Sequence, residues 1–152
     1  MYKKSNLAHS AFSFFTLFGL PVTFLPLLAY LLKTHPHTAI RASLIFAATE
    51  AVCASIKFLY RKERPVPIHK VPVMTFFHIY EAGSFPSIHT ARITSFFVIT
   101  TALFHNPVLA VGTGILVIAV ACSRIYLKKH YLIDVAGGFL IGALISTGGL
   151  LI

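Results

Sequence analysis

Two histidines and one aspartate have a spacing that could support nucleophilic chemistry. His130 and Asp134 are four residues apart, so on one helix face the carboxylate can accept a hydrogen bond from one ring nitrogen and fix the tautomer. The other nitrogen is then free to act as a nucleophile. His89 lies on a different apolar segment and can protonate a departing oxygen. These three residues are the candidate catalytic group.

Three cations lie where the sequence has few carboxylates to match their charge, Glu63 beside Arg64 being the nearest. Lys57, Arg64 and Arg124 therefore predict an external anion, and arginine offers the paired donors that fit phosphate oxygens. Ser87 lies in the first turn of a predicted helix, where free backbone N–H groups favour negative charge. A phosphate group fits all of these donors. Taken one at a time, the cations could instead anchor helices at an interface, and the histidine–aspartate pair could be a helix cap.

The composition places these residues in a small membrane protein. Of 152 residues, 57% are hydrophobic and 11% are charged, whereas soluble domains have about 25% charged residues. The 13 lysines and arginines face only 4 acidic residues, too few for a calcium or magnesium cage. The polar surface is also too small for a protein that only binds nucleic acid. The histidines show no zinc-ligand spacing, so we predict no metal or other cofactor and no nucleic-acid partner.

Five apolar stretches are long enough to cross a hydrocarbon core, which takes about 20 helical residues. Pro21 and Pro26 predict kinks in the first stretch. We predict an all-α, polytopic transmembrane helix bundle that forms a single domain over residues 1–152. All three polar clusters sit at helix ends on one side, so the bundle can bring them together at one membrane face. The predicted spans cover residues 11–32, 38–60, 87–104, 107–125 and 131–152.

The three clusters also resemble the signature motifs of a known family, the type 2 phosphatidic acid phosphatases (PAP2 superfamily). The resemblance implies a metal-independent phosphatase that acts on lipid phosphates through a phosphohistidine intermediate. It implies His130 as nucleophile, Asp134 as its orienting partner and His89 as general acid. The residues that would hold the phosphoryl group are Lys57, Arg64, Ser87 and Arg124. The matching motifs are Lys57-x6-Arg64-Pro65, Pro86-Ser87-Ile88-His89 and Ser123-Arg124-x5-His130-x3-Asp134.

The sequence departs from the family pattern in two places. Ile88 stands where the family usually has glycine, which removes access to positive φ and adds bulk beside the phosphate site. Integral members typically have six spans and five are predicted here, so the missing span would be the first, which carries none of the motifs.

We predict a lipid phosphatase whose partners are its substrate and the bilayer; the pattern predicts no particular oligomer. By resemblance, the candidate substrates are polyprenyl diphosphates, phosphatidylglycerophosphate, phosphatidic acid and lipid A 1-phosphate. The alternative is a lipid-phosphate carrier or flippase, which would use the same cations. A carrier has no use for a nucleophile and a proton donor, so the histidine pair favours the enzyme.

The lysines and arginines give conflicting indications of orientation. All of them except Lys33 and Arg41 fall on the predicted site face, which by the positive-inside rule would be cytoplasmic. The family resemblance implies a multi-pass protein of the cell (inner) membrane with an extracytoplasmic site. We favour the second interpretation, because phosphate and headgroup binding can recruit cations independently of insertion.

Several residues outside the motifs carry weaker predictions. Glu50 lies in the middle of a span, where ionisable groups are costly, and we interpret it as a hydrogen-bond partner of another helix. Arg92, one turn beyond His89, either touches a headgroup or anchors a helix. The loop over residues 65–86 has an apolar part, residues 73–80, that suits the headgroup level and lateral substrate entry. Glycines in the last span are expected to permit close helix packing; they are Gly137, Gly138 and Gly142.

Overall fold

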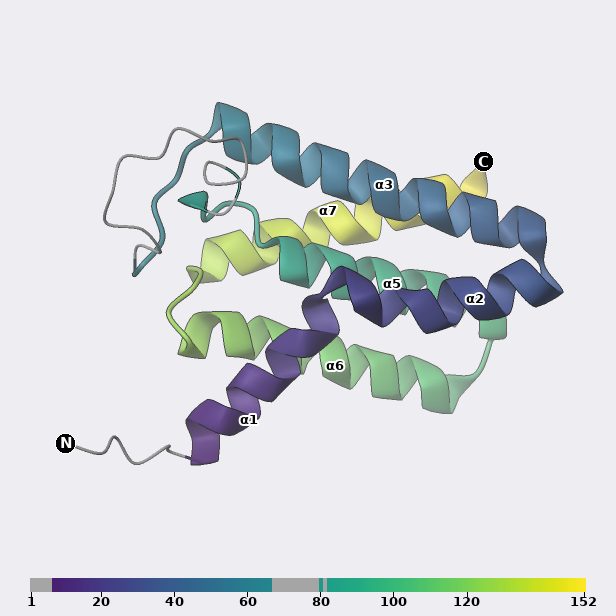
Figure 1. Cartoon of the computed structure of the whole chain (residues 1–152), viewed down its shortest axis with the longest axis horizontal. Helices are drawn as coiled ribbons and strands as arrows, with labels where there is room; N and C mark the ends of the chain where they lie inside the picture. Colours follow the sequence, from purple (N-terminus) through teal and green to yellow (C-terminus); the bar gives the residue numbers. More distant parts are fainter. Residues whose placement is uncertain (1–6, 67–79, 81) are drawn as a thin grey trace.

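The computed structural model describes residues 7–66, 80 and 82–152, and this part of the chain is helical without strands (Figure 1). The predicted all-α bundle is confirmed. The apolar part of the long loop, apart from Tyr80, lies outside the described residues. The elements are α1 (Leu7–Thr16), the short 3-10 helices η1 (Leu17–Gly19) and η2 (Pro21–Phe24), α2 (Leu25–Thr34), α3 (Pro36–Leu59), α5 (Ile88–Phe104), α6 (Pro107–Tyr126) and α7 (Leu132–Leu151).

The first predicted span is broken in the middle. Its two halves, Leu7–Gly19 and Pro21–Thr34, are bent by 59°. Leu20 has an extended backbone and Pro21 starts the second half, because a proline cannot donate the hydrogen bond that would continue the first. Pro26 lies in the first turn of α2, where proline is tolerated. The kink predicted at Pro21 is therefore confirmed, and the one at Pro26 is not found.

The remaining four stretches are continuous helices of unequal length. In the part of the chain that is described, α3, α6 and α7 are each long and apolar enough to cross a membrane, and the bent pair could form a fourth span. α5 has 17 residues, about 25 Å at 1.5 Å per residue. It is the central helix and packs against α3, α6, α7 and η1 (Figure 1). Protein rather than lipid surrounds much of α5, so its length need not match the hydrocarbon core.

Glycines let α7 approach α5 closely. A Cβ atom on Gly138 would collide with the carbonyl oxygen of Ser87, and one on Gly142 with that of Ala91. The predicted packing role of these glycines is confirmed, and it follows the small-residue rule for membrane helices. As a result the first turn of α7 reaches the start of α5, where the backbone N–H of Ser87 donates to the carbonyl oxygen of Asp134 at 2.8 Å.

Candidate active site

The three predicted clusters meet at the end of the bundle where α3 and α6 finish and α5 and α7 begin (Figure 1). Most of the candidate side chains are hidden from solvent although they are polar or charged. Such burial is unusual for lysine, arginine and aspartate unless they are paired. The buried members are Lys57, Ser87, Arg124, His130 and Asp134, and the half-buried ones are Arg64 and His89.

The imidazole of His130 is held by a backbone carbonyl. Its Nδ1 lies 2.7 Å from the carbonyl oxygen of Ser84 and 3.9 Å from Oδ2 of Asp134. The direct hydrogen bond expected between His130 and Asp134 is therefore not formed. The physical reason is that α7 begins at Leu132, so His130 precedes the helix and the helical i, i+4 geometry does not apply to it. Nδ1–H donates to Ser84, and Nε2 keeps a free lone pair.

Asp134 acts on His130 through Ser84. Its fully buried carboxylate accepts a hydrogen bond from the Ser84 hydroxyl at 2.5 Å and one from the backbone N–H of Tyr131 at 2.8 Å. Lys62 Nζ lies 2.6 Å from the other carboxylate oxygen. The helix-cap interpretation holds for Asp134, which caps the start of α7 by accepting from the N–H of Tyr131, whereas His130 contacts the Ser84 carbonyl instead. One carboxylate thus fixes both the helix start and the serine that orients the histidine.

Lys62 and Ser84 were not singled out as site residues by the sequence. Lys62 lies inside the first motif, between Lys57 and Arg64, and Ser84 lies two residues before the second motif, which begins at Pro86. That proximity was the available signal, but no spacing rule connects either residue to Asp134. Their contacts depend on the path of the backbone after α3 and before α5.

The cations line the same region, and two are held by neutral oxygens. Lys57 Nζ donates to the carbonyl oxygen of Gly83 at 2.5 Å, and Nη1 of Arg124 donates to Oγ1 of Thr16 at 3.3 Å. Among the described residues, the buried Nε of Arg124 and Nδ1 of His89 have no hydrogen-bond partner. Buried polar atoms are almost always paired, so these two atoms indicate room for a polar ligand.

Burial and positive charge keep His130 neutral. The residue lies in the turn between α6 and α7. Burial has the largest effect, and with the charges of Arg64, Arg124 and Lys57 it lowers the pKa of His130 from 6.5 to about 2, against a small opposing contribution from the Ser84 hydrogen bond. A neutral imidazole with its Nδ1 proton held has Nε2 available as a nucleophile.

The start of α5 offers donors suited to an anion. Ser87 is the N-cap residue, and its hydroxyl oxygen accepts from Thr90 Oγ1 at 3.0 Å, so its own hydrogen can point to a ligand. Ile88 has 6% of its surface exposed and packs with Cys53 and Ala91. Positive φ values among the described non-glycine residues occur elsewhere in the chain. The helix start therefore does not require the glycine that the family pattern usually has.

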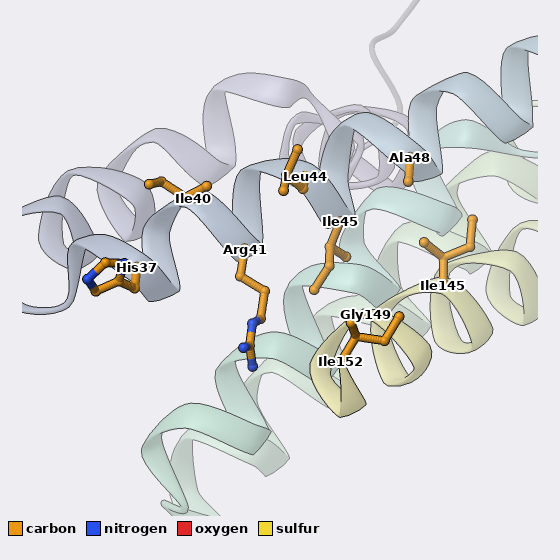
Figure 2. A pocket seen from close by; sticks show the side chains of 9 residues that line it. All are labelled: His37, Ile40, Arg41, Leu44, Ile45, Ala48, Ile145, Gly149 and Ile152. Carbon is orange, nitrogen blue, oxygen red and sulfur yellow. The ribbon is translucent and has the colours of Figure 1, made fainter.

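A cavity lies at the end of the bundle opposite the candidate site and contains none of the candidate residues. Its volume is about 530 Å³, and Figure 2 shows it between α3 and α7. The lining is mainly aliphatic, with one arginine and one histidine at its edge. The residues are His37, Ile40, Arg41, Leu44, Ile45, Ala48, Ile145, Gly149 and Ile152.

Fold and site together define a helical membrane protein with a histidine-containing, cation-lined site at one end of the bundle. The sequence pattern of the PAP2 superfamily matches residues 38–152, and the chain belongs to this superfamily. The family membership that the three motifs predicted is confirmed.

Two solved structures share the fold. The crystal structure of Aquifex aeolicus LpxE superimposes with a TM-score of 0.79 at 20% sequence identity, covering 99% of this chain and 89% of that chain. A PAP2-type phosphatidylglycerolphosphate phosphatase from Bacillus subtilis gives a TM-score of 0.78 at 21% identity, covering 97% of this chain and 77% of that chain. No curated protein matches the sequence significantly.

Proposed function

We propose that this protein is a membrane lipid phosphatase that works through a phosphohistidine intermediate. The observation that carries the proposal is the buried, neutral His130, whose Nδ1 is held by Ser84. Positive charge from Lys57, Arg64 and Arg124 acts on that imidazole. Membership of the PAP2 superfamily supports the same reaction class.

The first step transfers the phosphoryl group to the protein. The lone pair on Nε2 of His130 attacks phosphorus, and the P–O bond to the lipid breaks. The leaving oxygen keeps the electron pair of that bond and takes a proton from the imidazolium form of His89, which becomes neutral. Lys57, Arg64, Arg124 and the hydroxyl of Ser87 hold the phosphoryl oxygens, where fixed positive charge stabilises the transition state.

The second step releases phosphate. Water attacks the phosphorus of phosphohistidine, His89 accepts one of its protons, and the P–N bond breaks. The electron pair returns to Nε2, which regenerates neutral His130 and gives inorganic phosphate. For a lipid monoester the first leaving group is the lipid alkoxide, and for a lipid diphosphate it is the lipid monophosphate. Both steps use only side chains of this chain, so we propose that no metal is required.

The proposed substrates are amphiphiles whose tail stays in the bilayer. The site lies at a helix end, which in a spanning bundle is the headgroup level. The candidates are a polyprenyl diphosphate, phosphatidylglycerophosphate, phosphatidic acid and lipid A 1-phosphate. One fold neighbour is by name a phosphatidylglycerolphosphate phosphatase, which supports this substrate class. We propose the cell (inner) membrane as the location, with the site on the extracytoplasmic side.

The test is phosphate release from these four lipids by the purified protein in detergent, with EDTA present. We expect release by the wild type, none by His130→Ala, and wild-type rates for His37→Ala, because His37 is an exposed histidine at the far end of the bundle. Release that requires added metal would contradict the metal-free mechanism. No release from any lipid, by a folded protein that still binds lipid phosphate, would favour the carrier or flippase instead.

A further inference from the structure

An ion pair joins two helices in the middle of the bundle. Arg92 on α5 contacts Glu50 on α3 through two nitrogens: Nη2 donates to Oε2 at 2.8 Å, and Nε donates to Oε1. The predicted helix-to-helix hydrogen bond of Glu50 is thus present, and Arg92 anchors a helix. Paired charges inside a membrane protein are costly to place there and usually mark a functional element. Neither residue belongs to the three motifs.

The same arginine also holds the break in the first span. Its Nη1 donates to the carbonyl oxygen of Gly19 at 3.3 Å, where η1 ends. Gly19 in turn lies directly on His89: a Cβ atom added to Gly19 would be 2.7 Å from Cβ and 2.9 Å from Cδ2 of that histidine. The wall against His89 is therefore backbone, and Arg92 fixes its position.

The carboxylate side of the pair reaches the phosphate-binding end of the site. The hydroxyl of Tyr80 donates to Oε2 of Glu50 at 3.1 Å. The ring of Tyr80 lies 5.6 Å from Nζ of Lys57, within the range of a cation–π contact. One polar network therefore connects α3, α5, η1 and the end of the long loop, and it borders His89 on one side and Lys57 on the other.

We propose that Glu50 and Arg92 are positioning residues that hold His89 in place for proton transfer. This inference rests on the proposed function, in which His89 is the general acid. Neither member of the pair touches the reacting atoms. Arg92 acts through the carbonyl of Gly19, whose backbone packs on His89. Glu50 contacts Arg92 through two hydrogen bonds, and this bidentate contact fixes the orientation of the guanidinium, which a contact with a single point charge would not do.

A positioning role for His89 has a chemical signature that a purely structural role lacks. An alkoxide leaving group is strongly basic and needs the proton that His89 supplies, whereas a nitrophenolate leaves without one. Displacing His89 should therefore slow the cleavage of an alkyl phosphate and spare that of an aryl phosphate. The ratio of the two kcat/KM values reports this directly, because kcat/KM covers only the steps up to departure of the leaving group.

The experiment compares phosphatidic acid with p-nitrophenyl phosphate in detergent. For Glu50→Gln and Arg92→Met we expect kcat/KM on phosphatidic acid to fall by about 10- to 100-fold, the size of a misplacement effect, and kcat/KM on p-nitrophenyl phosphate to fall by about threefold or less. Gly19→Ala leaves the ion pair intact but pushes on His89, so it should give the same pattern. His89→Asn supplies the reference ratio. Arg41→Met, an exposed arginine on α3, is the matched control and should change neither value.

The possible results separate the two claims. A fall of equal size on both substrates, or wild-type values for Glu50→Gln and Gly19→Ala, would overturn the positioning role while leaving the phosphatase intact. If wild type is active and His89→Asn fails to discriminate between the substrates, the general-acid assignment fails and the inference fails with it. Absence of phosphate release in the wild type would instead overturn the proposed function. Should Arg92→Met not fold, the isosteric Glu50→Gln decides.

Discussion

Ser84 carries two contacts that the candidate nucleophile depends on. Its carbonyl oxygen accepts from Nδ1 of His130, and its hydroxyl donates to Asp134. Ser84→Ala keeps the carbonyl but removes the hydroxyl that holds this backbone in place. We expect kcat to fall about tenfold, with a small change in KM, since loss of one buried hydrogen bond costs about 1–3 kcal/mol. Phosphate release at saturating lipid measures it.

The control for that variant is Ser55→Ala on the exposed face of α3, where the hydroxyl donates to the carbonyl oxygen of Ala51 in its own helix. This variant should match the wild type. Wild-type kcat for Ser84→Ala would show that the orientation of His130 does not pass through the Ser84 hydroxyl.

The lowered pKa of His130 predicts how stability depends on pH. In the folded protein the pKa is about 2, whereas an unfolded histidine has a pKa of about 6.5. Above pH 6.5 both states are neutral and His130 contributes nothing. Below it the unfolded state binds the extra proton, so the folded state loses stability as the pH falls. The Tm should therefore drop more between pH 7 and pH 5 in the wild type than in His130→Gln, which cannot titrate.

Added inorganic phosphate should reduce that drop in the wild type, because a bound anion offsets the surrounding cations. If the Tm of the wild type and that of His130→Gln fell by the same amount between pH 7 and pH 5, His130 would not be buried in its neutral form.

At the residue scale, the sequence predicts a site residue where a rule connects its spacing to a position in the fold. The motif residues could be assigned together because Lys57, Arg124 and Ser87 each lie at a helix end, and helix ends on one side of a bundle meet. The partner of His130 could not be predicted, because it is a backbone carbonyl whose position depends on the turn before α5. The role of Lys62 and the identity of the partner of Glu50 likewise depend on which segments become neighbours, and no spacing rule predicts that from a single sequence.

At the scale of the helices, the contact between α5 and α7 determines whether the site is assembled. Gly138 lies on α7 one turn after Asp134, and a Cβ atom there would collide with the carbonyl oxygen of Ser87. Gly138→Ala should push the two helices apart, so we expect a Tm lower by several degrees and at least tenfold lower kcat, in line with overpacking costs of about 1–3 kcal/mol. Thermal unfolding in detergent and phosphate release measure the two effects.

Gly148→Ala on the same helix is the matched control. Its Cβ atom would meet nothing within 4 Å, and alanine favours the helix over glycine by about 1 kcal/mol. This variant should keep full activity with an equal or higher Tm. If Gly138→Ala and Gly148→Ala both lost activity, the close contact between α5 and α7 would not explain why glycine is needed on this helix.

Helix boundaries show the same division between local and tertiary information. Pro21 interrupts the first span because proline lacks the N–H that the helix requires, an effect that can be read from one residue. Pro26 has the same chemistry, yet it falls in the first turn of α2 and disturbs nothing. Whether a proline interrupts the helix therefore depends on its position relative to the break. The break itself is stabilised by a tertiary contact, the hydrogen bond from Arg92 to the carbonyl oxygen of Gly19.

At the scale of the whole molecule, the site face carries most of the lysines and arginines, but the structure gives several of them other roles. Lys62 pairs with Asp134 and Arg92 with Glu50, while Lys57 and Arg124 are buried. The positive-inside rule concerns cations in loops near the span ends, whereas Lys57, Arg92 and Arg124 lie within helices. Lys62 does lie in a loop, but Asp134 offsets its charge. Excluding these residues weakens the charge asymmetry that argues against an extracytoplasmic site.

The proposed orientation predicts which exposed positions a membrane-impermeant thiol reagent reaches in intact cells. Lys128→Cys lies in the exposed turn beside His130, and His37→Cys lies at the opposite end of the bundle. Both belong in a Cys122→Ser background, because Cys122 is exposed while Cys53 is buried and need not be changed. We expect Lys128→Cys to be labelled in intact cells and His37→Cys only after permeabilisation. The reverse pattern would place the site in the cytoplasm, where the substrate headgroup would have to be presented from the inner leaflet.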